Sequence, residues 1–174
     1  MSHTIENSNR NDQIVKEALF YVGQREEHGN SGFINGSFEI EMKEEGWQEG
    51  WAWCCLFAKV VFKNVYPERA AELNKLFSPS CVKTYQNARD GGYLINELPN
   101  VGNLVLWQSV KEGKPQATGH AGIVIKLKST WEFESVEGNG SEKGSREGTT
   151  VVIQQRKVLK DVWNGLKVIG FVKI

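Results

Sequence analysis

The chain has 174 residues, of which 40 % are hydrophobic and 24 % are charged, and its 21 lysines and arginines balance 21 aspartates and glutamates. This length supports one domain with a substantial core and is short for two. The even charge excludes a general attraction to nucleic acid or to an anionic membrane surface, so a partner must be recognised by a local site.

Residues 1–10 are rich in Ser and Asn, and we expect them to form a disordered tail ahead of a single domain over residues 11–174. Asn11 or Asp12 is predicted to cap the first helix, which ends near Gly23. The tail has no apolar run, so the sequence predicts neither a secretory signal nor a membrane anchor, and we expect synthesis in the cytoplasm.

The segment 26–50 mixes Gly, Asn, Ser and Glu and is predicted to be a long loop, a feature that is often functional in a compact domain. A helix follows from Cys54 to about Tyr66, with an apolar face opposite Lys59 and Lys63. Two shorter helices are expected next, over residues 67–77 and 79–89.

Beyond residue 100 the apolar period changes to that of strands. We expect strands over five ranges: 103–109, 120–127, 130–136, 149–155 and 166–173. Helices followed by strands predict an α+β domain in which an antiparallel sheet of about five strands packs on the cysteine helix.

Cys54 is the first candidate for chemistry. A cysteine in the first turn of a helix lies among unpaired backbone N–H groups and the positive end of the helix dipole, which favour the nucleophilic thiolate. The helix alone leaves a second interpretation open, that Cys54 is a small buried core residue. Cys55 is turned about 100° away and is not equivalent. Three cysteines without a C-x-x-C spacing predict neither a disulfide framework nor a zinc site.

A thiol nucleophile needs a base and a group that orients the base. Of the three histidines, His3 lies in the tail and His28 in the long loop, whereas His120 opens a predicted strand between small residues and is the best candidate. The next strand ends in Glu137-Gly138-Asn139, and alternation places Glu137 and Asn139 on one face, where either could orient His120. Alternatively, His120 is structural, Glu137 is a surface carboxylate and Asn139 belongs to a turn.

Three blocks together resemble the signatures of CHAP domains, which are papain-like cysteine amidases and peptidases related to NlpC/P60 proteins. The blocks are Trp53-Cys54 at the start of an apolar helix, Gly-His-Ala-Gly-Ile-Val at 119–124, and Val-Glu-Gly-Asn at 136–139. The resemblance covers residues 50–140. The strand that begins at Asn103 also resembles a family block that usually has Asp at this position, so Asn103 is given no role.

The resemblance implies a papain-like fold, with Cys54 as the nucleophile and His120 as the general base and later the general acid. It implies that Glu137 orients His120 and that Asn139 is a supporting polar partner. Gln48 lies six residues before Cys54, where papain-type enzymes have the glutamine of the oxyanion hole, and is either that group or a solvated loop residue.

Some CHAP proteins bind calcium near the cysteine through closely spaced aspartates. The preceding loop lacks such a D-x-D pattern, so we expect no metal and no cofactor. Its acidic residues in the half nearer the cysteine are Glu39, Glu41, Glu44, Glu45 and Glu49.

The sequence contains six tryptophans. We expect Trp131 and Trp163, together with the third cysteine, Cys81, to be buried in the core. Three others lie nearer the proposed cleft and belong either to the core or to a lining for sugar or peptide: Trp47, Trp51 and Trp107.

The resemblance implies a peptidoglycan hydrolase that cuts a muramoyl–alanine amide or a stem or cross-bridge peptide bond. Since no export signal is predicted, we expect either a phage endolysin, which reaches the cell wall after holin-type release, or an injected bacteriolytic effector. The expected partner is peptidoglycan, bound by a monomer, with no nucleic acid and no membrane insertion. Two alternatives stay open: a cytoplasmic papain-like peptidase acting on a protein, and a non-catalytic structural module, for instance of a phage tail.

Overall fold

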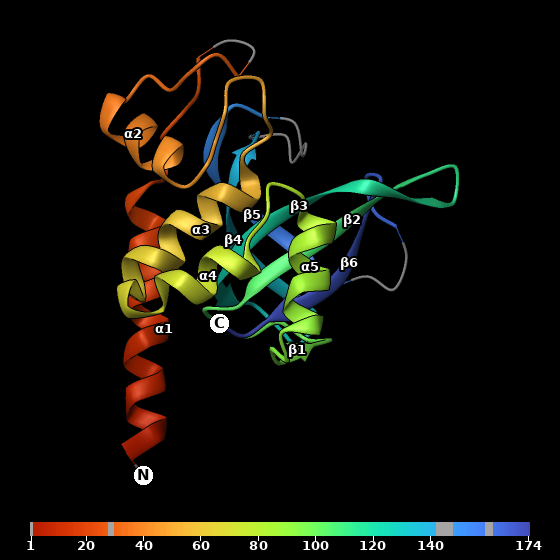
Figure 1. The fold of residues 1–174 in the computed structure, drawn as a ribbon. Coiled ribbons are helices and arrows are strands. Elements are labelled where there is room, and N and C mark those ends of the chain that lie inside the picture. The colour runs from red at the N-terminus through yellow and green to blue at the C-terminus, as the bar shows by residue number, and fades with distance from the viewer. Residues whose placement is uncertain (1, 28–29, 142–147, 159–161) are drawn as a thin grey trace.

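The computed structural model describes residues 2–27, 30–141, 148–158 and 162–174 (Figure 1). Helices come first along the chain: α1 (Ser2–Phe20), α2 (Gly36–Glu44), α3 (Cys54–Val65), a 3-10 turn (Pro67–Arg69), α4 (Ala70–Leu76) and α5 (Cys81–Asp90). Strands follow: β1 (Ile95–Asn96), β2 (Leu104–Lys111), β3 (Lys114–Leu127), β4 (Glu132–Gly140), β5 (Thr150–Lys157) and β6 (Leu166–Val172).

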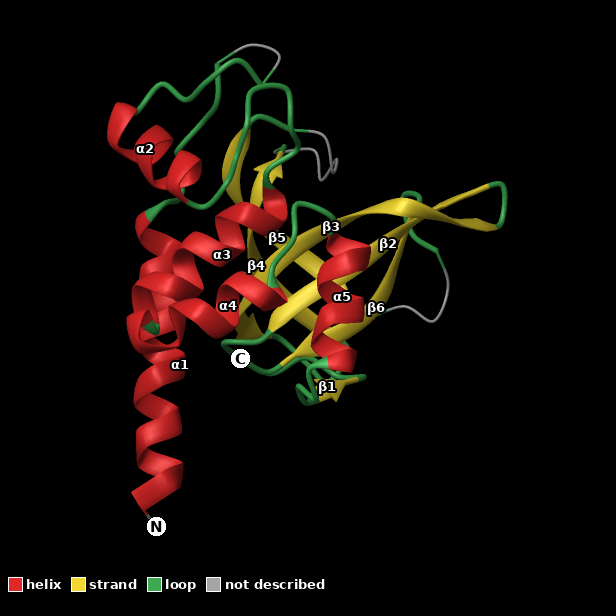
Figure 2. Cartoon of the chain, viewed as in Figure 1, coloured by secondary structure: helices red, strands yellow, loops and turns green. Residues whose placement is uncertain are grey.

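The strands form one sheet in the order β1-β6-β2-β3-β4-β5, and each neighbouring pair is antiparallel. Figure 2 shows the helices gathered on one side of this sheet. The predicted α+β class is therefore confirmed. The sheet has a sixth strand because the two-residue β1 pairs with the end of β6, a pairing too short to leave a periodic signal in the sequence.

α3 is the central helix of the fold. Nine of its twelve residues are buried, so it contacts other elements on nearly all sides, as its apolar composition requires. Lys59 and Lys63 are on the side predicted to be polar, and both reach Glu45, with Nζ to carboxylate oxygen distances of 3.1 and 2.5 Å. The predicted apolar face of α3 is confirmed.

The two faces of the sheet bury different residues because side chains alternate along a strand. Leu104 and Leu106 of β2 join the core beneath the helices. Val105 and Trp107 join a second cluster, which contains Phe133 of β4. Because β2 is buried on both faces of the sheet, its sequence is a continuous apolar run.

The segment 26–50 contains a helix, α2, that the sequence analysis missed. Asn35 caps α2, since its side chain accepts hydrogen bonds from the backbone N–H groups of Ser37 and Phe38 at 3.0 and 3.3 Å. Phe38 and Met42, four residues apart, are both buried. An asparagine followed by this spacing is a helix signal, which the surrounding Gly and Ser residues obscured.

The bounds of α1 and β3 also differ from those expected. Residues 2–10, expected to form a disordered tail, are helical, and α1 runs from Ser2 without a Gly or Pro to interrupt it. β3 begins at Lys114, six residues before His120. Glu112 and Gly113, with φ of 51° and 74°, form the two-residue turn that joins it to β2.

Some of the tryptophans differ in burial from what the sequence predicts. Trp131 and Trp163 are 52 % and 46 % exposed, so their predicted burial is wrong. Both flank strand ends, where a large ring can cover neighbouring side chains without being enclosed. Trp47 and Trp107 are buried, and Trp51 is 40 % exposed. Within the described residues, no helix has the length and apolar character needed to cross a membrane.

Candidate active site

Cys54 is the first residue of α3, as the sequence predicts. Trp53 precedes it as the N-cap residue and is fully buried, with its Nε1–H donating to Oε2 of Glu26 at 2.6 Å. Within the described part of the chain, no side chain caps this helix end. The first backbone N–H groups of α3 are therefore free to bind a developing negative charge.

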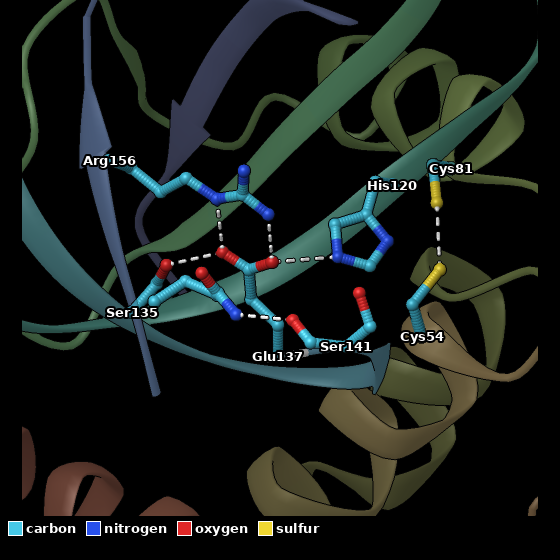
Figure 3. Close-up of polar contacts among 8 residues, drawn as sticks. Cys54, Cys81, His120, Ser135, Glu137, Ser141 and Arg156 are labelled. Atoms are coloured by element: carbon cyan, nitrogen blue, oxygen red, sulfur yellow. Dashed lines mark hydrogen bonds and ion pairs between the residues drawn. The ribbon is translucent and has the colours of Figure 1, made fainter. Parts of the chain in front are cut away.

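Glu137 and His120 form the contact expected from the mechanism. Nε2 of His120 lies 2.8 Å from Oε2 of Glu137, and both side chains are fully buried (Figure 3). A neutral His120 donates this hydrogen bond from Nε2, which leaves the Nδ1 lone pair available as a base. Figure 3 shows the Nδ1 edge of the ring turned toward Cys54.

Nδ1 of His120 has no hydrogen-bond partner among the described residues. Catalytic hydrogen bonds are often long before substrate binds, so a small movement of the Cys54 thiol would engage this nitrogen. Burial lowers the pKa of His120, but the thiolate of Cys54 and the carboxylate of Glu137 outweigh it and raise the pKa to about 9. Near neutral pH the imidazole is thus held as a cation between two negative groups.

Two further residues hold the carboxylate of Glu137. Nε of Arg156 donates to Oε1 at 2.7 Å and Nη2 donates to Oε2 at 2.5 Å, while Oγ of Ser135 donates to Oε1 at 2.6 Å. Burial raises the pKa of Glu137, yet hydrogen bonds from Arg156 and His120 bring it down to about 2. Glu137 is therefore a permanent carboxylate in a fixed orientation.

Arg156 was missed by the sequence analysis. It lies on β5 opposite Phe133, and its guanidinium sits 5.3 Å from the centre of the Trp107 ring. The same tryptophan ring faces His120, with centroids 5.7 Å apart. Arg156 lies on the neighbouring strand, 19 residues after Glu137 in the chain, so no local pattern could reveal it. Ser135 could have been found, since it lies two residues before Glu137 on the same strand face.

Two glycines, in the sequence blocks 119–124 and 136–139, allow close contacts around Glu137 and the start of α3. A Cβ on Gly122 would lie 2.8 Å from Cγ of Glu137, and a Cβ on Gly138 would lie 2.7 Å from both Cβ of Phe57 and Cζ3 of Trp53. Only glycine lets Glu137 pass over β3 and lets β4 approach the start of α3 this closely.

Cys54 belongs to a cluster of three buried, free thiols. Its Sγ lies 3.6 Å from Sγ of Cys81, which in turn lies 3.0 Å from Sγ of Cys55. Hydrogen bonding with Cys55 and Cys81, together with the charge of His120, holds the pKa of Cys54 well below its usual value despite burial. Burial and the contact with Cys54 keep the pKa of Cys55 well above its usual value, and contacts with Cys54 and Cys55, together with burial, do the same for Cys81.

Cys54 opens onto a cleft of about 430 Å³. Most residues that line it are small, and Trp51 contributes the one large aromatic ring among them. The lining consists of Gly50, Trp51, Ala52, Cys54, Pro79, Ser80, Cys81, Ala117, Thr118, Gly119 and Asn139. The expected burial of Cys81 is confirmed, and the same residue borders the cleft.

The remaining predicted residues are placed as follows. Asn139 lines the cleft beside Cys54, but its φ of 55° and the register shift after Glu137 break the alternation that was expected to align the two side chains. Gln48 is exposed in the turn before α3 and is not among the residues that line the cleft. The side chain of His3 and all of His28 lie outside the described residues.

In the described part of the chain, no group of three or more His, Cys, Asp and Glu side chains is placed to hold a metal ion. Comparison with protein-family models gives no match to the chain, and comparison with curated proteins also gives none. The arrangement of Cys54, His120 and Glu137 is therefore the basis for inferring a function.

Proposed function

We propose that the chain is a thiol-dependent hydrolase of amide bonds, with Cys54 as the nucleophile. The observation that carries the proposal is the buried line from the cysteine at the start of α3 through His120 to Glu137. Folding alone does not require a carboxylate held by Arg156 and Ser135 to bond a buried histidine beside a thiol of lowered pKa. A nucleophile that lines a cleft, a buried base and a group that orients the base are the parts of a thiol hydrolase.

The mechanism follows from the positions of these groups. Sγ of the Cys54 thiolate attacks the amide carbonyl carbon, and the backbone N–H groups at the start of α3 stabilise the oxyanion. The imidazolium of His120 gives its proton to the leaving amine as the C–N bond breaks, which leaves a thioester. Neutral His120 then takes a proton from water, whose oxygen attacks the thioester and releases the acid. Glu137 keeps the ring aligned throughout.

We propose peptidoglycan as the substrate, on the resemblance of three sequence blocks to CHAP domains and on the form of the cleft. In this proposal the fold is papain-like, with the cysteine helix packed on the sheet that carries the histidine. Small residues beside Cys54 suit a peptide stem of short side chains, and the exposed ring of Trp51 suits a sugar or peptide backbone. Delivery to the wall by phage-type release or injection belongs to the same proposal.

The test is digestion of purified peptidoglycan from both Gram classes, followed by mass spectrometry of the soluble products. We expect wild type to release free stem peptides if it is an amidase, or shortened or uncoupled stems if it is an endopeptidase. Cys54→Ala should release nothing. Lys157→Ala, which changes an exposed residue of β5, should act as wild type does.

Two results would redirect the proposal. If wild type released nothing from either wall while a thiol reagent still labelled Cys54 rapidly, the wall substrate would be wrong, and protein amides would be tested next. If Cys54→Ala were as active as wild type, the thiol mechanism itself would be wrong. The non-catalytic alternative predicts neither hydrolysis nor rapid labelling.

A further inference from the structure

The thiol of Cys81 has no part in the hydrolytic mechanism, yet it borders the same cleft as Cys54. The two cysteines are each the first residue of a helix, α3 and α5, and their Sγ atoms lie 3.6 Å apart. A disulfide needs an S–S distance of about 2.05 Å, so side-chain movement of roughly 1.5 Å would join them. Cys55 also contacts Cys81 but is fully buried and does not line the cleft.

We propose that Cys54 and Cys81 form a reversible oxidation site, in which Cys81 is the resolving thiol for a peroxide-oxidised Cys54. The proposal rests on the reactive thiolate assigned to Cys54 above, but not on any substrate. Its ligand is a small peroxide such as hydrogen peroxide, which can enter the cleft that Cys54 lines.

The chemistry has two balanced steps. The Cys54 thiolate attacks one oxygen of hydrogen peroxide, the O–O bond breaks, and Cys54 sulfenic acid and hydroxide form. The Cys81 sulfur then attacks the sulfenic sulfur, the S–O bond breaks, and the hydroxyl leaves as water with the proton of Cys81. The products are a Cys54–Cys81 disulfide and water, and two thiol sulfurs have been oxidised by one peroxide. A dithiol reductant restores both thiols.

Cys81 is better placed than Cys55 to resolve the sulfenic acid. Adjacent residues in a helical turn point about 100° apart, so a Cys54–Cys55 bridge would require the start of α3 to unwind. Cys81 approaches from a separate helix and can close on Cys54 by side-chain rotation. The disulfide would shield Cys54 from the further, irreversible oxidation to sulfinic acid.

The experiment exposes the purified full chain to hydrogen peroxide and maps its disulfides by mass spectrometry after blocking free thiols. In wild type we expect two of the three free thiols to be lost and a peptide pair that links Cys54 to Cys81. Dithiothreitol should restore all three. Cys81→Ser should give no disulfide and instead accumulate Cys54 sulfinic acid, while Cys55→Ser should give the same linked pair as wild type.

Two outcomes would overturn the proposal. One is that Cys54 passes to sulfinic acid equally fast in wild type and in Cys81→Ser; the other is a linked pair that contains Cys55 instead of Cys54. A separate sample is treated with iodoacetamide before oxidation. Its alkylation rate at Cys54 distinguishes a failure of the oxidation proposal from a failure of the proposed hydrolase function. Rapid alkylation without a disulfide refutes only the resolving role of Cys81, whereas no alkylation also counts against Cys54 as a nucleophile.

Discussion

Replacing Arg156 with methionine tests whether the buried carboxylate of Glu137 depends on its guanidinium partner. Arg156 is 3 % exposed and Glu137 is fully buried, and two hydrogen bonds join them. Arg156→Met keeps most of the side-chain volume but leaves the carboxylate without its main donor. Removing one partner of a buried ion pair costs about 3 to 5 kcal/mol, because the remaining charge is stranded away from water.

The pKa of Glu137 gives a related magnitude, to which Arg156 and His120 both contribute against the effect of burial. Its fall from the usual 4.5 to about 2 corresponds to roughly 3 kcal/mol, at about 1.4 kcal/mol per pKa unit. Because the native pKa is the lower one, this stabilisation is present in wild type above about pH 4.5 and is lost as the pH falls toward 2. The difference in unfolding free energy between wild type and Arg156→Met should therefore shrink across that range.

A surface pair in the same chain provides the matched control. Arg69 also bonds Glu72 through two nitrogens, at 2.8 and 2.6 Å, but the two side chains are 29 % and 47 % exposed. The pKa of Glu72 is likewise lowered to about 2, chiefly by Arg69. Solvent screens this pair, so Arg69→Met should cost less than about 1 kcal/mol.

Urea denaturation of both variants, measured at several pH values, checks the reasoning. We expect Arg156→Met to lose at least about three times as much unfolding free energy at neutral pH as Arg69→Met, from the ranges for buried and exposed pairs. Equal losses, or a pH dependence of Arg156→Met identical to that of wild type, would refute the claim that burial makes the Arg156–Glu137 pair important.

Three other predictions concern the same site and the helix that the sequence analysis missed. The pKa of His120 is about 9 rather than the usual 6.5, so the stabilisation from its charged form is complete below about pH 6.5 and is lost as the pH rises through 9. His120→Ala should therefore raise the pH midpoint for alkylation of Cys54 by iodoacetamide. An unchanged midpoint would exclude coupling between the two residues. Gly138→Ala places a Cβ 2.7 Å from side chains of the α3 region and should lower the unfolding free energy by about 1 to 3 kcal/mol, whereas Gly36→Ala, with open space around it, should not; similar losses would contradict the tight approach. Asn35→Ala removes the cap of α2 and should cost about 1 kcal/mol in urea denaturation, and no loss would mean that the cap is dispensable.

The sequence was sufficient to predict the elements that have a clear local pattern of apolar and polar residues. The period of α3, with Lys59 and Lys63 opposite an apolar face, identified the central helix and placed Cys54 at its start. The change of period after residue 100 identified the strands and the α+β class. Such features follow from interactions within a turn of helix or between alternate residues of a strand, which a linear sequence displays directly.

Partly local signals were misread. The cap of α2 was hidden by surrounding Gly and Ser, and the turn at Glu112-Gly113 was not recognised as the start of a longer β3. The strict alternation assumed for Glu137 and Asn139 failed because Asn139 has a positive φ and the register between β4 and β5 shifts after Glu137. These errors arise where one residue departs from a regular period.

Only the tertiary structure decided which groups surround the site. Arg156 reaches Glu137 from the neighbouring strand β5, and Cys81 meets Cys54 from another helix, each through contacts between residues far apart in the chain. The fold buries the Glu137–Arg156 pair and brings the three thiols into contact with one another. The sequence could name Cys54, His120 and Glu137 as candidates, but their distances and pKa shifts depend on the fold that removes them from water.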